Sequence, residues 1–539
     1  MRGRRSVVDD RVPKALQSSV PAHKQGKKLG ERIGADHTLA RGEILGAIDV
    51  GTNAVRLKLA RLLPDGSFEA VHQERDPVRP GEGVWQTGAM ARPVVDRLVA
   101  TLKEYAGICR RHKAGHVRAV ATSALREAKN RDEVTARVRA QAGIELEIVS
   151  GQEEARLICL GVLRGMPAAS RSLLFDIGGG STEVARAAGE EPVELWSMPI
   201  GAVRLGEMFS DEANRGVITR ELLTRMRRYA QRVIGEALPK SIAGAPKHAL
   251  GSSGTIRTVC AFAASPGTAH ASRDGLSRAV EELVQLGPEG RRKRFDSARA
   301  EILVAGAVIL EALAHHLRID SITAVDGGLK EGLLVDLVRR SRQRSVDPLL
   351  SQAVLTAGRS FAFDEPHALH TRDVALSLYD QLGKVHGLPA DARLILEVAA
   401  TLHDVGMAVS RSRHHKHSQY LIKNMDLPGL SDHERELAAV VARFHRRSTP
   451  HLDHPELKRL NDVEGRLVRK LATLLRIADA TDRGRQSAVA SLNVVTHART
   501  VLVRVHATKG RDLEAWDLKA DAALFRSVFG KALDLQVAR

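Results

Sequence analysis

The sequence EILGAIDVGTNAVRLKLARLL, at residues 43–63, decides the fold. An apolar run ends in Asp49, a turn with a glycine follows, and a second run alternates apolar and polar residues. This pattern predicts two antiparallel strands joined by a tight turn. A similar unit, LLFDIGGGSTEVARAA, occurs at residues 173–188 and also carries an aspartate, Asp176, at the end of its first run. The similarity predicts an internal duplication with two related halves.

Both turns have the composition of a phosphate-binding loop. Backbone N–H groups reach phosphate oxygens only where glycine or another small residue lets the chain come close. Asp49 and Asp176 stand where a divalent cation that bridges protein and phosphate would need a carboxylate. The sequence has no GxxxxGK[ST] loop, and neither turn opens a helix as a dinucleotide fingerprint would. An ordinary hairpin is the alternative for each turn taken alone, and the two matching copies favour a phosphate site.

The rest of the chain divides into α/β and helical parts. Strands are predicted over 117–122 and 146–149 and a helix over 154–163, so the pattern alternates up to about residue 335. Strand signals then vanish, and alternation returns only at 491–505, before a helix predicted over 521–533. The predicted organisation is a disordered basic tail over 1–42, two α/β lobes over 43–165 and 166–335, a helical domain over 336–485 and a small C-terminal α+β module over 486–539.

The composition points to a folded protein with an anionic partner. Its 539 residues include 82 Lys and Arg against 64 Asp and Glu, which gives a formal net charge of +18. Such an excess favours a polyanionic ligand, with a solvated basic surface as the alternative. Aromatic residues make up only 3% of the chain, which makes nucleic acid an unlikely partner, since stacked bases need exposed rings. A phosphate-rich ligand without bases fits better.

Cysteine usage and hydropathy indicate the compartment. Cys109, Cys159 and Cys260 are far apart in the sequence and offer neither a disulfide framework nor a CxxC zinc site. The longest apolar run, over 302–310, is too short to span a bilayer. The paired arginines near the N-terminus are not followed by an apolar stretch. We therefore expect a cytoplasmic protein without a signal peptide and without a membrane partner.

Six motifs, in order along the chain, resemble the exopolyphosphatase and guanosine pentaphosphate phosphohydrolase family. They are AIDVGTNAVRL (47–57), ATSALREAKN (121–130), SGQEEARL (150–157), DIGGGSTE (176–183), GSSGT (251–255) and DGGLKEG (326–332). That family belongs to the actin, heat-shock chaperone and sugar-kinase superfamily, in which two related lobes enclose phosphates in a cleft. The resemblance implies an α/β fold of two actin-like lobes, followed by an all-α HD-like domain and the small α+β module, as in long family members.

The resemblance also implies a hydrolase with Mg²⁺ as its cofactor. The implied reaction is hydrolysis of the terminal phosphate of linear inorganic polyphosphate, with hydrolysis of guanosine pentaphosphate (pppGpp), or of both, as the alternative. Ser150 and Glu153 form the S-x-x-E pattern of a capping box, which assigns Glu153 to a helix start and leaves Glu154 free. Glu154 aligns with the family's catalytic glutamate, which accepts the proton of the attacking water.

Other site residues are implied by the same resemblance. Asp176 and Glu183 look like the family's catalytic pair for binding magnesium and orienting phosphate or water, and Asp49 is their counterpart in the first lobe. Ala54 stands where the family usually has a serine, so one hydroxyl is lost there. The residues expected to bind phosphate are Gly51, Thr52, Asn53, Arg56, Arg126, Gly178, Gly179, Ser181, Gly254 and Thr255.

The helical domain carries a second candidate metal site. His403 and Asp404, with His370 upstream and Asp479 downstream, have the order H...HD...D of the HD metal-dependent phosphohydrolases. Imidazoles and carboxylates on neighbouring helices could hold a divalent metal there. The alternative is a structural HD-like domain without metal. Additional candidate ligands are His417 and His445.

Partners and rival functions complete the expectations. Two basic clusters, over 411–417 and 443–447, would suit a channel for a long phosphate chain, with solvated charged faces as the alternative. By resemblance we expect a homodimer. GSSGT also resembles an adenosine-side loop, so an ATP-using kinase of the same superfamily is a rival. A non-enzymatic phosphate or alarmone sensor is another, and it would bind without releasing phosphate.

Overall fold

The computed structural model describes residues 39, 42–209, 216–240, 242, 246–264, 268, 270–342, 348–487, 489–507 and 519–538. Apart from residues 39 and 42, the basic tail predicted over 1–42 lies outside the described residues. None of the helices in this described part combines the length and the apolar character that crossing a bilayer requires. The three cysteines are buried and free.

The first lobe is built on a five-stranded sheet. Its strands are β1 (Ile44–Val50), β2 (Val55–Leu62), β3 (Phe68–Asp76), β4 (His116–Ala121) and β5 (Leu146–Ile148), and its helices are α1 (Val84–Thr87), α2 (Arg92–Arg111), α3 (Ser123–Glu127) and α4 (Arg131–Ala142). The strand order is β3-β2-β1-β4-β5. β1 and β2 form the predicted antiparallel hairpin, in which Asp49 lies opposite Arg56, and β4 pairs parallel to β1. The apolar face of α2 packs on this sheet.

The second lobe repeats this topology. Its strands are β6 (Arg171–Ile177), β7 (Thr182–Ala188), β8 (Glu191–Met198), β9 (His248–Ser252), β10 (His270–Ser272) and β11 (Ser321–Ala324), and its helices are α6 (Ala202–Met208), α7 (Arg220–Ala237), α8 (Ser253–Ala263), α9 (Arg273–Gln285), α10 (Gly287–Arg294) and α11 (Ser297–His316). In each lobe an antiparallel three-strand meander is followed by a strand that pairs parallel to the first one. The strands β1 to β4 therefore correspond to β6 to β9, and the predicted internal duplication is confirmed.

Two helices, α5 (Gly151–Val162) and α12 (Leu329–Arg342), cross in close contact. An added Cβ at Gly332 would lie 1.7 Å from the carbonyl oxygen of Leu157, and one at Gly161 would lie 2.1 Å from the carbonyl oxygen of Gly328. Only glycine allows the two backbones to approach this closely. The crossing holds α5, which carries Glu154 in its first turn, against the end of the second lobe. The helix α12 is continuous through residue 336, where the sequence pattern sets a domain boundary.

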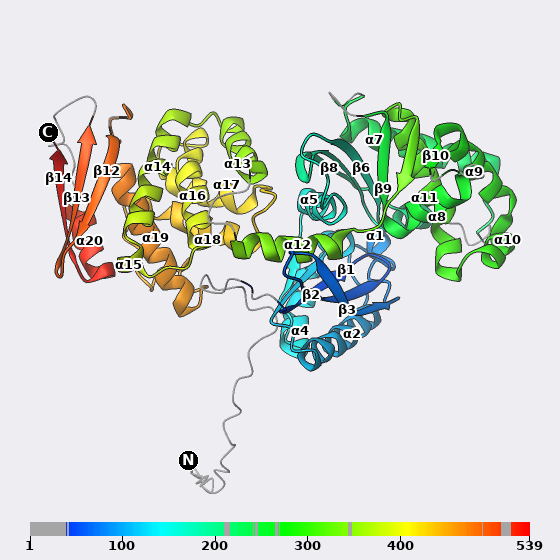
Figure 1. Cartoon of the computed structure of the whole chain (residues 1–539), viewed down its shortest axis with the longest axis horizontal. Helices are drawn as coiled ribbons and strands as arrows, with labels where there is room; N and C mark the ends of the chain where they lie inside the picture. The colour runs from blue at the N-terminus through cyan, green and yellow to red at the C-terminus, as the bar shows by residue number, and fades with distance from the viewer. Residues whose placement is uncertain are drawn as a thin grey trace, which may run out of the picture.

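The helical part comes after α12. Its helices are α13 (Pro348–Ser360), α14 (Glu365–Gln381), α15 (Gly383–His386), α16 (Ala392–Leu402), α17 (His414–Asn424), α18 (Asp432–Arg443) and α19 (Asp462–Ala480), with a 3-10 turn η2 (Val405–Ala408). No strand occurs among the described residues of 348–485, as the sequence pattern predicts. In Figure 1 the two lobes lie on one side of the molecule and the helical part on the other, with α12 running between them.

The C-terminal segment differs from its prediction in one element. Its strands are β12 (Val489–Thr496), β13 (Thr500–Ala507) and β14 (Ala532–Ala538), and its helix is α20 (Lys519–Phe529). The prediction of a helix over 521–533 is therefore wrong at its end. Gly530, with a left-handed φ of 69°, terminates the helix. The alternating residues after it pair in parallel with β13, and their apolar side chains join the core of the helical part.

A buried ion network joins the lobes to the helical part. Asp336 of α12 accepts hydrogen bonds from Arg118 (2.5 Å), Arg156 (2.6 Å) and Arg340 (2.5 Å). Arg340 in turn donates to Glu434 of α18 at 3.1 Å. Because Asp336, Arg118 and Arg156 are buried, each of these charges depends on its partners in place of water. The network therefore ties the orientation of the helical part to α5 and α12.

Candidate active site

The two predicted phosphate turns lie against each other across the lobes. An added Cβ at Gly179 would lie 2.7 Å from the Cβ of Thr52, and one at Gly180 would lie 2.5 Å from the Oγ of Ser123 and from the ring of Trp85. These glycines are needed because any side chain there would collide with the opposite lobe. The structure thus brings the first turn, the second turn and the start of α3 into one place, as the duplication predicts.

Four carboxylates gather at these turns. Asp49 is the next-to-last residue of β1, Glu154 lies in the first turn of α5, and Asp176 and Glu183 are direct partners in the antiparallel register of β6 and β7. Asp49, Glu154 and Glu183 are buried, and Asp176 is half-buried. Like charges placed opposite each other on two strands are destabilising unless something neutralises them. The sheet therefore positions negative charge at the point where the turns meet.

Burial raises the pKa values of Glu154, Asp176 and Glu183. Burial raises the pKa of Glu154 to about 7, and Asp49 and Asp176 add to the shift although Arg126 opposes it. Burial likewise raises the pKa of Asp176 to about 6, against the hydrogen bond from Ser252 and the charge of Arg56. Burial also raises the pKa of Glu183 well above its usual range, with repulsion from Glu154 and Asp176 added to it. A bound cation would relieve this repulsion.

The donor set fits a magnesium ion that shares its coordination with a substrate. Among the described residues, no three of these carboxylates have ligand oxygens within 4.8 Å of one another. A cation here would therefore take one or two carboxylates and complete its shell with water and phosphate oxygens, which is how Mg²⁺ is usually bound. One oxygen of Glu183 accepts a hydrogen bond from Ser197 at 2.9 Å, and the other is buried without a well-formed hydrogen bond. Asp49, Asp176 and Glu183 are thus suitable ligands.

Cationic side chains surround the cluster. Arg56 donates to Asp49 at 2.9 Å with 36% of its side chain exposed, so it is available to a ligand. Arg126 donates to Glu154 at 3.0 Å and to the carbonyl of Val149 at 2.9 Å. Guanidinium groups in this arrangement can pair with phosphate oxygens while they orient the carboxylates.

The structure corrects the interpretation of Glu153. Ser150 caps α5 by accepting a hydrogen bond from the backbone N–H of Glu153, as the S-x-x-E pattern predicts. The Glu153 carboxylate, however, does not return to the helix start. It pairs with Arg156 at 2.7 Å and accepts the backbone N–H of Gly429, from the helical part, at 2.7 Å. The capping box is wrong because a buried tertiary partner outcompetes the local one, and Glu154 is nevertheless left facing the cluster.

The GSSGT motif contributes in a different way from the one expected. Ser252 donates a short hydrogen bond to Asp176, since the two residues are register partners in β9 and β6. An added Cβ at Gly254 would lie 2.4 Å from the guanidinium of Arg299, and Thr255 packs against Gly306 of α11. Gly254 and Thr255 therefore serve the packing of α8 on α11, and their phosphate-binding role stays a prediction. The functional candidates that sequence reasoning missed are Ser252, which lies inside a recognised motif, and Ser197, for which no local signal exists.

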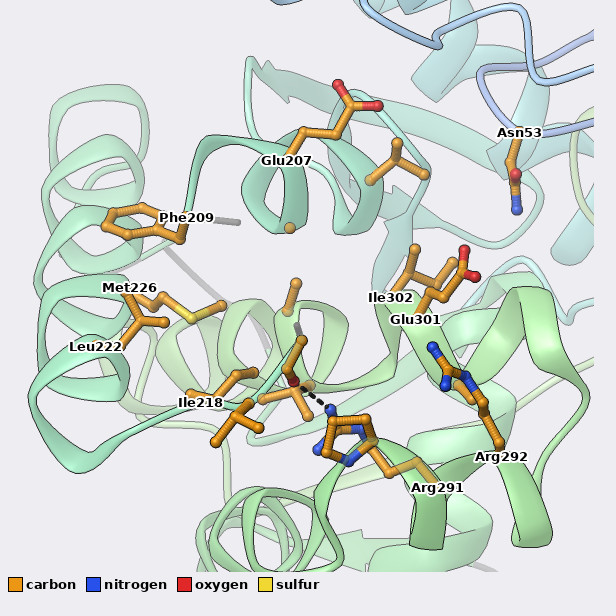
Figure 2. Close-up of a pocket in the computed structure, with 18 of the residues that line it drawn as sticks. Asn53, Glu207, Phe209, Ile218, Leu222, Met226, Arg291, Arg292, Glu301 and Ile302 are labelled. Atoms are coloured by element: carbon orange, nitrogen blue, oxygen red, sulfur yellow. Dashed lines mark hydrogen bonds between the residues drawn. The ribbon is translucent and has the colours of Figure 1, made fainter. Parts of the chain in front are cut away.

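A cavity of about 310 Å³ opens beside the first phosphate turn. Figure 2 shows an apolar side made by Phe209, Ile218, Leu222 and Met226, and a polar side with Asn53. Further polar residues at its margin are Glu207, Arg291, Arg292 and Glu301. An apolar wall with a few polar groups near a phosphate turn suits an aromatic ring attached to phosphates.

A groove between the first lobe and the helical part leads away from Arg126. It has a volume of about 610 Å³ and carries four arginines and one histidine of the lobe and the helical part against six carboxylates, among them Asp426 and Asp432. Of the predicted basic clusters, His414, His415, Arg443 and His445 are buried in the helical part. A groove with this charge balance gives a long polyanion little electrostatic attraction. The four buried residues cannot line a channel open to a polyanion, so the clusters over 411–417 and 443–447 offer fewer cations than expected.

The second candidate metal site is assembled differently from its prediction. The structure brings His403, Asp404 and Asp479 together, but His370 lies outside the cluster and His367, one turn earlier on α14, takes its place. Two histidines three residues apart on a helix differ by about 60° in direction, which the H...HD...D order alone does not resolve. His445 joins the cluster as predicted. His417 does not, and His414 of the same helix does.

Comparisons with known proteins identify a family that matches both parts of the chain. A model of the Ppx/GppA phosphatase family matches residues 63–341, and a model of domain III of the Ppx/GppA phosphatases matches residues 350–522. The chain is 28% identical to a PPX-GPPA enzyme of Aquifex aeolicus, with 54% of this chain and 99% of that chain covered and a TM-score of 0.46. It is 26% identical to an exopolyphosphatase from Cytophaga hutchinsonii, with 56% and 99% covered and a TM-score of 0.49. The family models therefore span most of the two lobes and most of the helical and C-terminal parts.

Proposed function

Because the chain belongs to the Ppx/GppA phosphatase family, we propose that it is an exopolyphosphatase, which hydrolyses the terminal phosphate of linear inorganic polyphosphate with Mg²⁺ as cofactor. The observation that carries this proposal is the cluster of four carboxylates at the point where the two phosphate turns meet. Such a cluster has no use in packing, because its mutual repulsion costs stability, and it suits phosphoryl transfer to water.

Glu154 is the general base of the proposed reaction. It takes a proton from a water molecule as the oxygen of that water attacks the terminal phosphorus, and the bond from phosphorus to the bridging oxygen breaks. Arg126, 3.0 Å from Glu154, orients the carboxylate and pairs with the transferred phosphate. The N–H groups of Thr52 and Asn53 and of Gly179 to Ser181 bind phosphate oxygens, while those of Gly51 and Gly178 close the turns by donating to the carbonyls of Ala54 and Ser181. One or two of Asp49, Asp176 and Glu183 would hold a magnesium ion, which would supply neutralisation of the phosphate charge.

Hydrolysis of guanosine pentaphosphate is the second candidate. The observation in its favour is the cavity beside Thr52 and Asn53, whose apolar side could receive a base while the phosphates lie in the turns. The first candidate needs no such cavity. Only guanosine pentaphosphate would therefore occupy this cavity, whereas both substrates would use the phosphate turns.

A substitution that fills the cavity separates the two candidates. We expect wild-type protein with Mg²⁺ to release phosphate faster from long-chain polyphosphate than from guanosine pentaphosphate. Leu222→Trp places a large ring in the cavity, so it should raise KM for guanosine pentaphosphate about tenfold or more and leave polyphosphate hydrolysis unchanged, since a lost apolar contact is worth about 1–3 kcal/mol. Steady-state rates on both substrates, measured side by side, provide the test.

Three outcomes would count against the main proposal. Faster release from guanosine pentaphosphate, abolished by Leu222→Trp, would favour the second candidate. Transfer of label from ATP to a second substrate would favour the kinase. Tight binding of either compound without phosphate release would favour the sensor.

Other features of the protein, expected from its sequence pattern or from the family resemblance, are also proposed. They are the division into lobes over 43–165 and 166–335, an HD-like domain over 336–485 and a terminal module over 486–539, together with a homodimer and a cytoplasmic location. The match of the domain III model to residues 350–522 supports a distinct unit after the lobes.

A further inference from the structure

We propose that the helical part binds a pair of divalent transition-metal ions bridged by Asp404, at a centre independent of the cleft between the lobes. The centre lies where α14, the end of α16, α17, the end of α18 and α19 meet. Its six ligands fall into two groups, and in each group the ligand atoms lie within 4.8 Å of one another. The groups are His367, His403 and Asp479, and Asp404, His414 and His445.

The first group converges on one point. The Nε2 atoms of His367 and His403 each lie 3.5 Å from Oδ1 of Asp479. Oδ2 of Asp404 lies 4.0 Å from Nε2 of His367 and 3.8 Å from Nε2 of His403. Two ligand atoms that bind one ion at about 2.1 Å are separated by about 3 to 3.6 Å when their angle at the metal is between about 90° and 120°. The separations from Asp479 fall within this range, and those from Oδ2 of Asp404 are slightly longer, so His367, His403 and Asp479 enclose the space of one ion with Asp404 at its edge.

The second group converges on the other oxygen of the same aspartate. Oδ1 of Asp404 lies 3.2 Å from Nε2 of His414 and 3.4 Å from Nε2 of His445. The two Nε2 atoms lie 3.2 Å from each other. Asp404 thus directs one oxygen to each group, which is the geometry of a bridging carboxylate.

The hydrogen bonds around the centre prepare the imidazoles to bind metal. Nδ1 of each histidine faces an acceptor outside the centre: the carboxylate of Asp482 for His367 at 2.8 Å, and backbone carbonyls for the other three. An Nδ1–H that donates outward leaves the lone pair of Nε2 pointing inward. Four imidazoles with their lone pairs aimed at two carboxylates form a ligand set. The carbonyls belong to Ala400 for His403, Arg411 for His414 and Ala442 for His445.

The centre is not explained by mutual ion pairing. Nε2 of His403 and Oδ1 of Asp404 are buried without a well-formed hydrogen bond, although charged partners lie within 4 Å. His403 is fully buried and His445 is 2% exposed, so water does not satisfy these atoms. Buried polar atoms left in this state are costly, and a metal ion would satisfy them.

The chemistry of the ligands selects the metal. Imidazole nitrogen with carboxylate oxygen suits Mn²⁺, Fe²⁺, Co²⁺, Ni²⁺ or Zn²⁺, whereas Mg²⁺ and Ca²⁺ prefer oxygen alone. The second group offers only three protein ligands, so open positions remain for water or a phosphate oxygen. Arg485, with 33% of its side chain exposed, donates to Asp404 and Asp364 at the solvent side. Arg485 would have to release Oδ2 of Asp404 when that oxygen binds an ion.

Metal stoichiometry tests the proposal. The full-length protein is stripped with a chelator, equilibrated with Mn²⁺, Co²⁺ or Zn²⁺ and desalted, and its bound metal is counted by mass spectrometry. We expect about two ions per chain in wild type, about one in His367→Gln, about one in His445→Gln and none in Asp404→Asn. His270→Gln, at an exposed histidine of the second lobe, is the matched control and should keep both ions.

The Co²⁺-loaded protein gives a second readout. Its visible absorption should fall by about half in each single histidine variant, while circular dichroism shows that the variants are folded. Wild type that retains one ion or none, or His367→Gln and His445→Gln that retain as many ions as His270→Gln, would overturn the proposal. If Asp404→Asn does not fold, the two histidine variants decide. Polyphosphate hydrolysis at the cleft is scored separately with Glu154→Gln, so failure of one centre is distinguishable from failure of the other.

Discussion

Burial makes the carboxyl group of Glu154 a weaker acid than an exposed glutamate, and a pH–rate profile can measure this. A general base must be ionised, and the pKa of Glu154 is raised to about 7 by burial and by its carboxylate neighbours. We therefore expect kcat/KM for polyphosphate to fall about tenfold per unit below about pH 7 and to level off above it. Arg126→Gln removes the cation that lowers this pKa, so the acid limb should move to higher pH. Rates recorded from about pH 5 to 9 provide the check.

A profile that is flat across this range would contradict the role of Glu154. A limb that moves to lower pH in Arg126→Gln would contradict the proposed interaction between the two residues. Because the four carboxylates influence one another, the measured value belongs to the cluster as a whole.

Site residues that stand inside a contiguous motif can be predicted from the sequence. Those that reach the site through pairing between distant segments cannot. Asp49, Glu154 and Asp176 could be named because each stands inside a short signature. The hydrogen bond from Ser252 to Asp176 depends on the register of β9 with β6, which the sequence does not contain. The choice of His367 over His370 likewise depends on how α14 is rotated against α19.

At the scale of elements, the junction of α5, α12 and the helical part rests on Asp336. Asp336→Asn would leave Arg118, Arg156 and Arg340 without their shared counter-charge in a buried place. Removing one member of a buried ion network costs about 3–5 kcal/mol, so we expect that loss in the free energy of unfolding. Urea denaturation provides the measurement, with Asp320→Asn, at an exposed ion pair, as the control.

A loss below about 1 kcal/mol would show that the network contributes little, as exposed pairs do.

The same junction explains why the local interpretation of Glu153 failed. A capping box is satisfied within one helical turn, but the buried Arg156 and the N–H of Gly429 offered Glu153 stronger partners. Element types were predicted better than their ends, because the end of α20 depends on a strand that pairs with β13.

At the scale of the whole molecule, net charge describes the ligand less well than local geometry. The chain has a formal charge of +18, yet the groove that leaves Arg126 carries more carboxylates than arginines. Two histidines that counted toward basic clusters, His414 and His445, are buried around Asp404. The repeated unit at residues 43–63 and 173–188 predicted the two-lobe plan, because an antiparallel hairpin with its turn is a local structure. The joining of the lobes to the helical part through α12 has no such local signal.

The central claim is that the site between the two lobes hydrolyses polyphosphate with Glu154 as the general base. The most direct test is the initial rate of phosphate release from long-chain polyphosphate at saturating Mg²⁺. We expect Glu154→Gln to lower the rate roughly 100- to 10,000-fold, or about 3 to 5 kcal/mol of barrier. Glu104→Gln, at an exposed glutamate of α2, should match wild type. Equal rates for wild type and Glu154→Gln would contradict the account and direct attention to the centre around Asp404.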